Sequence, residues 1–112
     1  MSEIEWADFQ KVELRLGTII EVSDFPKARN PSYILKVDFG EEIGIKKSSA
    51  QITDLYTKDD LINKQVVAVV NFPAKQIGPI MSECLVTGFH QRDGAVVLAV
   101  PDKDVANGVR LA

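Results

Sequence analysis

The amino-acid sequence predicts an all-β fold: a small closed β-barrel with a short N-terminal helix and a C-terminal extension. Short segments in which apolar and polar residues alternate recur along the chain, and glycine and proline turns separate them. A glycine also interrupts the first and longest of these segments, and such a bend curls a sheet into a barrel. With 112 residues, the chain is expected to form one domain over residues 1–112.

The N-terminal elements are a short helix and a long strand. Ser2 is followed three residues later by Glu5, which predicts a capping box and a helix over residues 3–9. Residues 11–22 alternate in polarity and predict a strand. Gly17 lies inside this strand, so we expect the bulge or sharp bend there.

A loop, a hairpin and a helical turn are expected in the middle of the chain. Two prolines predict a loop over residues 25–32. Alternation predicts a strand over residues 33–39, and a Gly-Glu-Glu turn leads into a second strand over residues 43–47. The polar residues 48–51 predict a loop, and residues 59–62 predict one turn of helix.

The C-terminal half alternates between strands and irregular segments. Residues 66–70 are all apolar and mostly β-branched, which predicts a strand buried on both faces. Prolines and a glycine make residues 71–82 a long irregular segment. Strands are expected over residues 84–89 and over residues 95–100, the latter after an Asp-Gly turn. Many short strands with a bent first strand are most economically an OB-fold β-barrel.

Composition and charge exclude several classes of protein. The formal net charge is −3, which argues against a general binder of polyanions. Residues 25–80 carry eight basic and six acidic groups, so a local anion site fits there. No apolar run reaches the roughly 18 residues of a membrane span. The N-terminus lacks the features of a signal peptide. We therefore expect a cytoplasmic protein without membrane insertion.

No catalytic or metal-binding constellation is recognisable. Cys84 and His90 are the only cysteine and histidine, and they lie in or beside one apolar strand, far apart along it. Cys84 is interpreted as a core or pocket residue and His90 as a surface residue. A single cysteine excludes an intramolecular disulfide, and no nucleotide-binding motif is present. We expect neither an enzyme nor a bound cofactor or metal ion.

The segment of residues 72–81 is too apolar for a solvated loop. It contains Phe72, Ile77, Ile80 and Met81 between its prolines. Three interpretations remain open: the segment packs back on its own barrel, lines an apolar cavity, or contacts a second subunit.

Several motifs resemble those of known proteins. Residues 8–17, Asp-Phe-Gln-Lys-Val-Glu-Leu-Arg-Leu-Gly, resemble the opening of tRNA-binding OB domains. Such domains are appended to methionyl-tRNA synthetases and to the phenylalanyl-tRNA synthetase beta subunit, and they also occur as free-standing dimers. Residues 25–29, 38–53, 69–73 and 82–86 are similar to the CsaA family, bacterial and archaeal chaperone-like proteins linked to protein export. The resemblance covers essentially the whole chain.

The resemblance implies a homodimeric chaperone that binds unfolded or pre-secretory polypeptides in the cytosol. It also suggests the export machinery and tRNA as partners. The tRNA-binding relatives carry a basic run, Lys-Arg-Lys-Met-Arg-Gly, where residues 74–78 of this chain read Ala-Lys-Gln-Ile-Gly. Because each lost phosphate contact lowers the affinity for RNA, this difference favours peptide binding. A structure-specific tRNA-binding protein is the alternative.

Two sets of binding residues are predicted. Loops at the mouth of an OB barrel commonly carry the ligand site. A groove with an apolar wall and a polar rim is therefore expected to bind peptide through Phe72, Pro73, Ile77, Ile80, Met81, Asn30, Pro31 and Ser82. Nucleic acid would contact Lys27, Arg29, Asn30, Lys46, Lys47 and Lys75. A homodimer would bury the surplus apolar residues Ile4, Trp6, Val96, Leu98, Val105, Val109 and Leu111.

Overall fold

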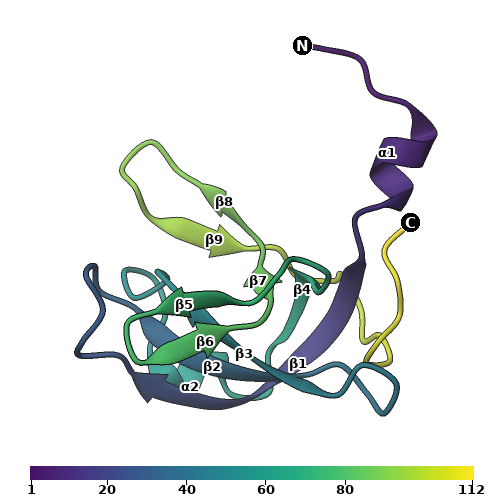
Figure 1. Cartoon of the computed structure of the whole chain (residues 1–112). Coiled ribbons are helices and arrows are strands. Elements are labelled where there is room, and N and C mark those ends of the chain that lie inside the picture. The colour runs from purple at the N-terminus through teal and green to yellow at the C-terminus, as the bar shows by residue number, and fades with distance from the viewer.

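The computed structural model describes all 112 residues and contains a five-stranded antiparallel sheet that curls into a near-closed barrel (Figure 1). The order of the strands in the sheet is β3-β2-β1-β4-β7. Their bounds are Leu14–Asp24 for β1, Tyr33–Asp38 for β2, Ile45–Ala50 for β3, Gln65–Val69 for β4 and Leu85–Val86 for β7. The predicted all-β, OB-like barrel is confirmed.

Strands β3 and β7 are the two edge strands of the sheet. Hydrogen bonds between β3 and the residues just before β7 narrow the gap between these two edges. The Glu83 N–H donates a hydrogen bond to the Lys47 carbonyl over 2.8 Å. The Lys47 N–H donates to Glu83 Oε1 over 2.9 Å, and the Ser49 N–H donates to Ser82 Oγ over 3.2 Å. Side-chain oxygens therefore replace part of the backbone ladder at this seam, which leaves the barrel partly open.

Strand β1 bends two to four residues later than the sequence predicted. Its register against β2 shifts between Ile19 and Glu21, which places a β-bulge there. Gly17 has a different role, because a Cβ built on it would lie 2.5 Å from Val37 Cγ1 and 2.7 Å from Phe39 Cε1. The glycine thus permits close packing against two core side chains, and the expectation of a bend at this residue is wrong.

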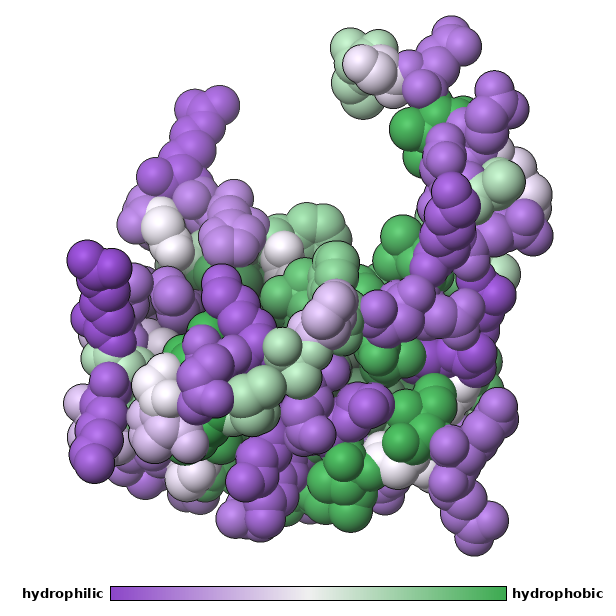
Figure 2. Space-filling view, viewed as in Figure 1, coloured by the Kyte–Doolittle hydropathy of each residue, from purple (hydrophilic) through white to green (hydrophobic).

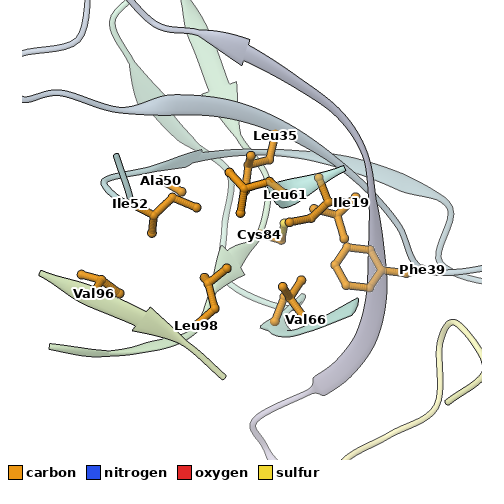
Figure 3. Close-up of a cluster of buried hydrophobic side chains, with 12 residues drawn as sticks. Ile19, Leu35, Phe39, Ala50, Ile52, Leu61, Val66, Cys84, Val96 and Leu98 are labelled. Carbon is orange, nitrogen blue, oxygen red and sulfur yellow. The ribbon is translucent and has the colours of Figure 1, made fainter. Parts of the chain in front are cut away.

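The hydrophobic core fills the barrel (Figure 3). Leu35 and Val37 of β2 are fully buried, as the alternation in that strand predicted. The loop expected over residues 48–51 is wrong, since β3 continues to Ala50 and turns Ser48 and Ala50 into the barrel. The core cluster consists of Ile19, Leu35, Val37, Phe39, Ala50, Ile52, Leu61, Val66, Ala68, Cys84, Val96 and Leu98.

Two short helices flank the barrel. Helix α1 spans Trp6–Gln10 and is capped by Glu5, whose N–H donates to Asp8 Oδ2 over 2.9 Å. The predicted helix exists, but its start at residue 3 and its cap at Ser2 are wrong. Helix α2 spans Lys58–Leu61, one residue from its predicted position, and buries Leu61 completely. Neither helix has the length and apolar character needed to cross a lipid bilayer.

Two hairpins project from the sheet. Strands β5, Lys75–Ile77, and β6, Ile80–Ser82, form the first, so the irregular segment predicted over residues 71–82 is only partly irregular. Strands β8, Gly88–His90, and β9, Val96–Leu98, form the second. The strand predicted over residues 84–89 is therefore divided between β7 and β8.

The C-terminal extension runs back along β1. The Gly108 N–H donates to the Leu16 carbonyl over 2.7 Å, and the Leu16 N–H donates to the Val109 carbonyl over 2.9 Å. The Leu111 N–H donates to the Leu14 carbonyl over 2.9 Å. This pairing holds the C-terminus near α1, which itself extends away from the barrel (Figure 1).

Candidate functional site

A groove of about 1170 Å³ lies where the β5–β6 hairpin approaches the barrel. Four segments that are distant in sequence contribute to it: the loop before β2, the end of β3, the chain from Phe72 into β5, and the chain from β6 into β7. The lining residues are Ala28, Arg29, Asn30, Ser32, Ser49, Gln51, Phe72, Pro73, Ala74, Lys75, Gln76, Ile77, Ser82, Glu83, Cys84 and Leu85.

Local turn chemistry positions the hairpin wall of this groove. Gly78 adopts a φ of +55° in the two-residue turn with Pro79, a conformation that glycine reaches without strain. The Gln76 Nε2 donates to the Gly78 carbonyl over 2.6 Å and braces the same turn. A Cβ at Gly78 would stand 3.6 Å from the ring of buried Phe25, so the turn lies close to the loop that precedes β2.

The loop before β2 forms the facing rim and is itself braced. The Ser32 hydroxyl is buried and donates to the Asn30 carbonyl over 2.9 Å. The Ala28 N–H donates to the Phe25 carbonyl over 3.1 Å. Arg29 and Asn30 are therefore presented at the groove by a hydrogen-bonded loop between two prolines.

The groove combines large apolar side chains with both signs of charge. Phe72 and Leu85 remain 56% and 50% exposed, which is high for side chains of this size. Arg29 and Lys75 contribute positive charge, and Glu83 contributes negative charge. Ligand sites commonly pair an apolar lining with a few polar groups that fix orientation.

Five of the eight predicted peptide-binding residues border the groove: Asn30, Phe72, Pro73, Ile77 and Ser82. Ile80 and Met81 belong to β6 but do not line the groove. Pro31 borders a smaller neighbouring hollow of about 480 Å³ instead. Cys84, interpreted from the sequence as a core or pocket residue, belongs to both the core and the groove lining. The prediction missed Ser49, Gln51 and Leu85, because only closure of the barrel brings β3 and β7 beside the hairpin.

The predicted nucleic-acid-binding residues are dispersed. Arg29, Asn30 and Lys75 border the groove, whereas Lys27, Lys46 and Lys47 do not. Lys46 and Lys47 are neighbours in β3, so their side chains leave opposite faces of the strand. The two lysines therefore do not form one basic patch.

Cys84 lies at the bottom of the groove and is only 6% exposed. Burial raises the pKa of its thiol to about 11, against the opposing effect of the nearby Lys46 charge. The thiol is consequently protonated and unreactive at neutral pH. His90 is exposed, as expected. No three His, Cys, Asp or Glu side chains lie together in a way that could hold a metal ion.

A second notable surface is apolar and lies at the two ends of the chain. Ile4 and Trp6 are 70% and 63% exposed, and Val109 and Leu111 are about half exposed. Figure 2 shows a hollow with hydrophobic residues on its floor, between the projecting N-terminal arm and the β8–β9 hairpin. Val96 and Leu98, expected among the surplus apolar residues, are instead buried in the core. A monomer thus leaves large apolar side chains at both ends of the chain open to solvent.

Comparison with known proteins places these features in a family. Residues 14–110 match the family model described as "Putative tRNA binding domain". The crystal structure of a chaperone CsaA from Bacillus anthracis is 43% identical, with a TM-score of 0.93, and the match covers 99% of this chain and 100% of that one. A CsaA chaperone protein from Picrophilus torridus is 52% identical, with a TM-score of 0.91 and 98% and 100% of the two chains covered.

Curated relatives include much longer proteins. A methionine–tRNA ligase from Thermococcus onnurineus is 35% identical over 108 residues, which are 96% of this chain but 14% of the ligase. The ligase from Flavobacterium psychrophilum is 35% identical over 106 residues, 94% of this chain and 15% of the ligase. The chain thus corresponds to one small part of these ligases. It belongs to the CsaA chaperone family, a non-catalytic branch of the tRNA-binding domain family.

Proposed function

We propose that this protein is an export-related chaperone, which binds unfolded or pre-secretory polypeptides in the groove and acts as a homodimer in the cytoplasm. The observation that carries the proposal is a groove in which half-exposed Phe72 and Leu85 accompany Ile77. Unfolded chains expose the apolar side chains that native proteins bury, and contact with such a wall removes apolar area from water. Each large apolar side chain buried in this way contributes about 1.5–3 kcal/mol.

The charge of the groove supports a polypeptide ligand over RNA. Arg29 and Lys75 oppose Glu83, so the lining carries a formal charge of +1 (two basic groups and one acidic group). Tight RNA binding relies on many phosphate contacts, each of which releases a counterion. Two basic groups beside a carboxylate provide little of that affinity, whereas they suit a polypeptide of mixed charge.

Dimerisation is supported by the exposed apolar ends of the chain. Ile4, Trp6, Val109 and Leu111 would be removed from water by a second copy related by a two-fold axis. A dimer also carries two grooves, so one long unfolded segment engages both and gains avidity. Modest affinity at each groove then permits release of the client to the export machinery.

The apolar contact is tested by two matched substitutions. Phe72→Asp places a charge in the groove, and Met81→Asp places the same charge on an exposed residue of the adjacent hairpin that does not line the groove. We expect the Phe72 variant to lose at least tenfold in affinity for a reduced, unfolded polypeptide, as burying an unpaired charge is costly. The Met81 variant should bind as the unsubstituted protein does. Equal binding by both variants would show that the groove does not hold the client.

A tRNA-binding function is the second candidate, because the matched family model describes a tRNA-binding domain. In that case Arg29 and Lys75 would contact phosphates together with Lys27, Lys46 and Lys47. Binding would then decline steeply with salt, in contrast to apolar peptide binding.

A further inference from the structure

The outer edge of strand β5 has no partner. Strand β5 pairs with β6 alone, in a separate two-stranded sheet. On the other side, β6 lies against β3 of the barrel. Apart from the ladder to β6, no backbone N–H or C=O between Phe72 and Ile77 takes part in a backbone hydrogen bond. An unpaired edge of this kind presents a row of donors and acceptors to a further strand.

The register of the hairpin identifies the group that faces outward. Ile77 and Ile80 flank the two-residue turn, so they form the closing hydrogen-bonded pair of the hairpin. Hydrogen-bonded and non-hydrogen-bonded pairs alternate along an antiparallel ladder. Gln76 and Met81 are the next pair, and the Gln76 N–H and C=O therefore point away from β6.

The groove reaches this open edge. All six consecutive residues from Phe72 to Ile77 line it. Successive side chains of a strand point to opposite faces, so a cavity beneath one face would be lined by alternate residues only. Because all three residues of β5 line it, the groove is not confined to one face of this strand and reaches its edge. An extended segment of about six residues spans roughly 20 Å in this direction.

We propose that a client polypeptide binds by adding a strand to the free edge of β5, with Gln76 as the main hydrogen-bonding residue. This inference rests on the proposed chaperone function and specifies how the groove recognises its ligand. Backbone amides are common to all polypeptides, so pairing with them gives affinity without a sequence requirement. Phe72 and Leu85 then contact alternate side chains of the added strand. Nucleic acid lacks this regular row of amides and cannot pair in the same way.

The edge also carries features that limit its self-association. Strand β5 has only three residues, and Lys75 is the first of them. Short edges and lysine side chains are devices by which proteins avoid edge-to-edge aggregation. Pro73 has no N–H, but it lies three residues before Gln76. Outward-facing N–H groups recur at every second residue of an extended chain, so the proline removes none of the donors that share the outward direction of the Gln76 N–H. The edge therefore accepts a single extended chain and resists sheet growth between copies.

Backbone methylation of a probe peptide tests strand addition. The probe is a fluorescein-labelled peptide of alternating valine and serine, flanked by one lysine and one glutamate. Its N-methylated forms carry methyl groups on one set of alternate residues, on the other set, or on both. Because an added strand pairs through one of its edges, at least one singly methylated set should bind within about threefold of the parent. The doubly methylated peptide should bind at least tenfold more weakly, and full retention of its binding overturns the proposal.

Two substitutions test the protein side. Gln76→Pro removes the outward N–H without removing a bond to β6, and Gln76→Ala removes the side chain but keeps the N–H. We expect at least tenfold weaker peptide binding by Gln76→Pro than by Gln76→Ala, and equal binding contradicts the proposal. If Gln76→Pro fails to show a cooperative thermal transition, the methylated peptides on the unsubstituted protein decide the question. If the parent peptide does not bind at all, the proposed chaperone function fails as well.

Discussion

Gly17 lies where the barrel leaves no room for a side chain. Its added Cβ would contact Val37 Cγ1 at 2.5 Å and the Phe39 ring at 2.7 Å, and both neighbours are buried. We expect Gly17→Ala to lower the free energy of unfolding by about 1–3 kcal/mol, measured by urea titration, because overpacking forces the core to move. Gly44→Ala is the control: nothing lies within 4 Å of its Cβ, so it adds only the strain of its φ of +85°. A Gly17→Ala variant as stable as the original protein would contradict this packing.

The Cys84 thiol provides a second prediction for a single residue. Since burial raises its pKa to about 11, the folded state favours the protonated form. At pH 8, iodoacetamide should modify it about 100-fold more slowly than a free thiol of ordinary pKa. The contribution of the thiol to stability is complete below its ordinary pKa of 9.0 and is lost as the pH rises towards 11. Cys84→Ala should remove this loss of stability at alkaline pH. A rapid reaction of the unsubstituted protein with iodoacetamide at pH 8 would show that the thiol is not buried.

Single residues differ in how far the sequence reveals their roles. Alternation in one strand is a strictly local signal, and it correctly predicted that Leu35 and Val37 are buried. Phe72 and Ile77 could be placed in the groove because large apolar residues between prolines are unusual in a loop. Gln51 and Leu85 gave no such signal, since their position in the groove depends on contacts between distant segments.

At the scale of elements, short strands escaped prediction for a physical reason. Strands β5 and β6 have three residues each, too few for alternation to be distinguished from chance. The two strands are stabilised by the turn at Gly78 and by packing of β6 against β3. The strand predicted to end at residue 47 continues to Ala50 because pairing with β2 compensates for the weak β-propensity of Ser48 and Ser49.

The C-terminal extension is tied to β1 by an ion-pair cluster around Glu13. Arg15 and Arg110 both contact this carboxylate, at 2.7 and 3.2 Å. The pKa of Glu13 is lowered mainly by the hydrogen bond from Arg15. The positive charges of Arg110 and Arg15 lower it further. The stabilisation that the charged Glu13 carboxylate provides is therefore fully present above its ordinary pKa of 4.5. It is lost only as the pH falls through the lowered pKa of the folded state.

Glu13→Gln should loosen this extension at neutral pH, because the amide does not pair with two guanidinium groups. We expect faster hydrogen exchange at the Leu111 and Gly108 N–H groups, which bond to β1. The Val67 N–H, which bonds to Ala99, is an internal control and should not change. Unaltered exchange at all three amides would mean that the backbone pairing holds the extension without Glu13.

At the scale of the whole molecule, the exposed apolar ends predict a dimer. Trp6 is the only tryptophan and is 63% exposed in one copy, so its fluorescence emission should shift to shorter wavelength as dimers form. Trp6→Asp should yield the monomeric mass by light scattering at micromolar concentration, since each copy loses about 1.5–3 kcal/mol of apolar burial. Leu55→Asp, on an exposed residue in the turn before α2, should leave the mass unchanged. A monomeric mass for the unsubstituted protein would rule out the dimer.

The most direct test of the central claim is one titration series with two ligands at two salt concentrations. An unfolded polypeptide and tRNA are titrated into the protein at about 50 mM and about 300 mM salt. An apolar groove with a formal charge of +1 predicts polypeptide binding that is unchanged or stronger at high salt. It predicts weak tRNA binding that declines further with salt. Tight tRNA binding at low salt with a steep salt dependence, together with no binding of the polypeptide, would contradict the chaperone function and favour a tRNA-binding protein.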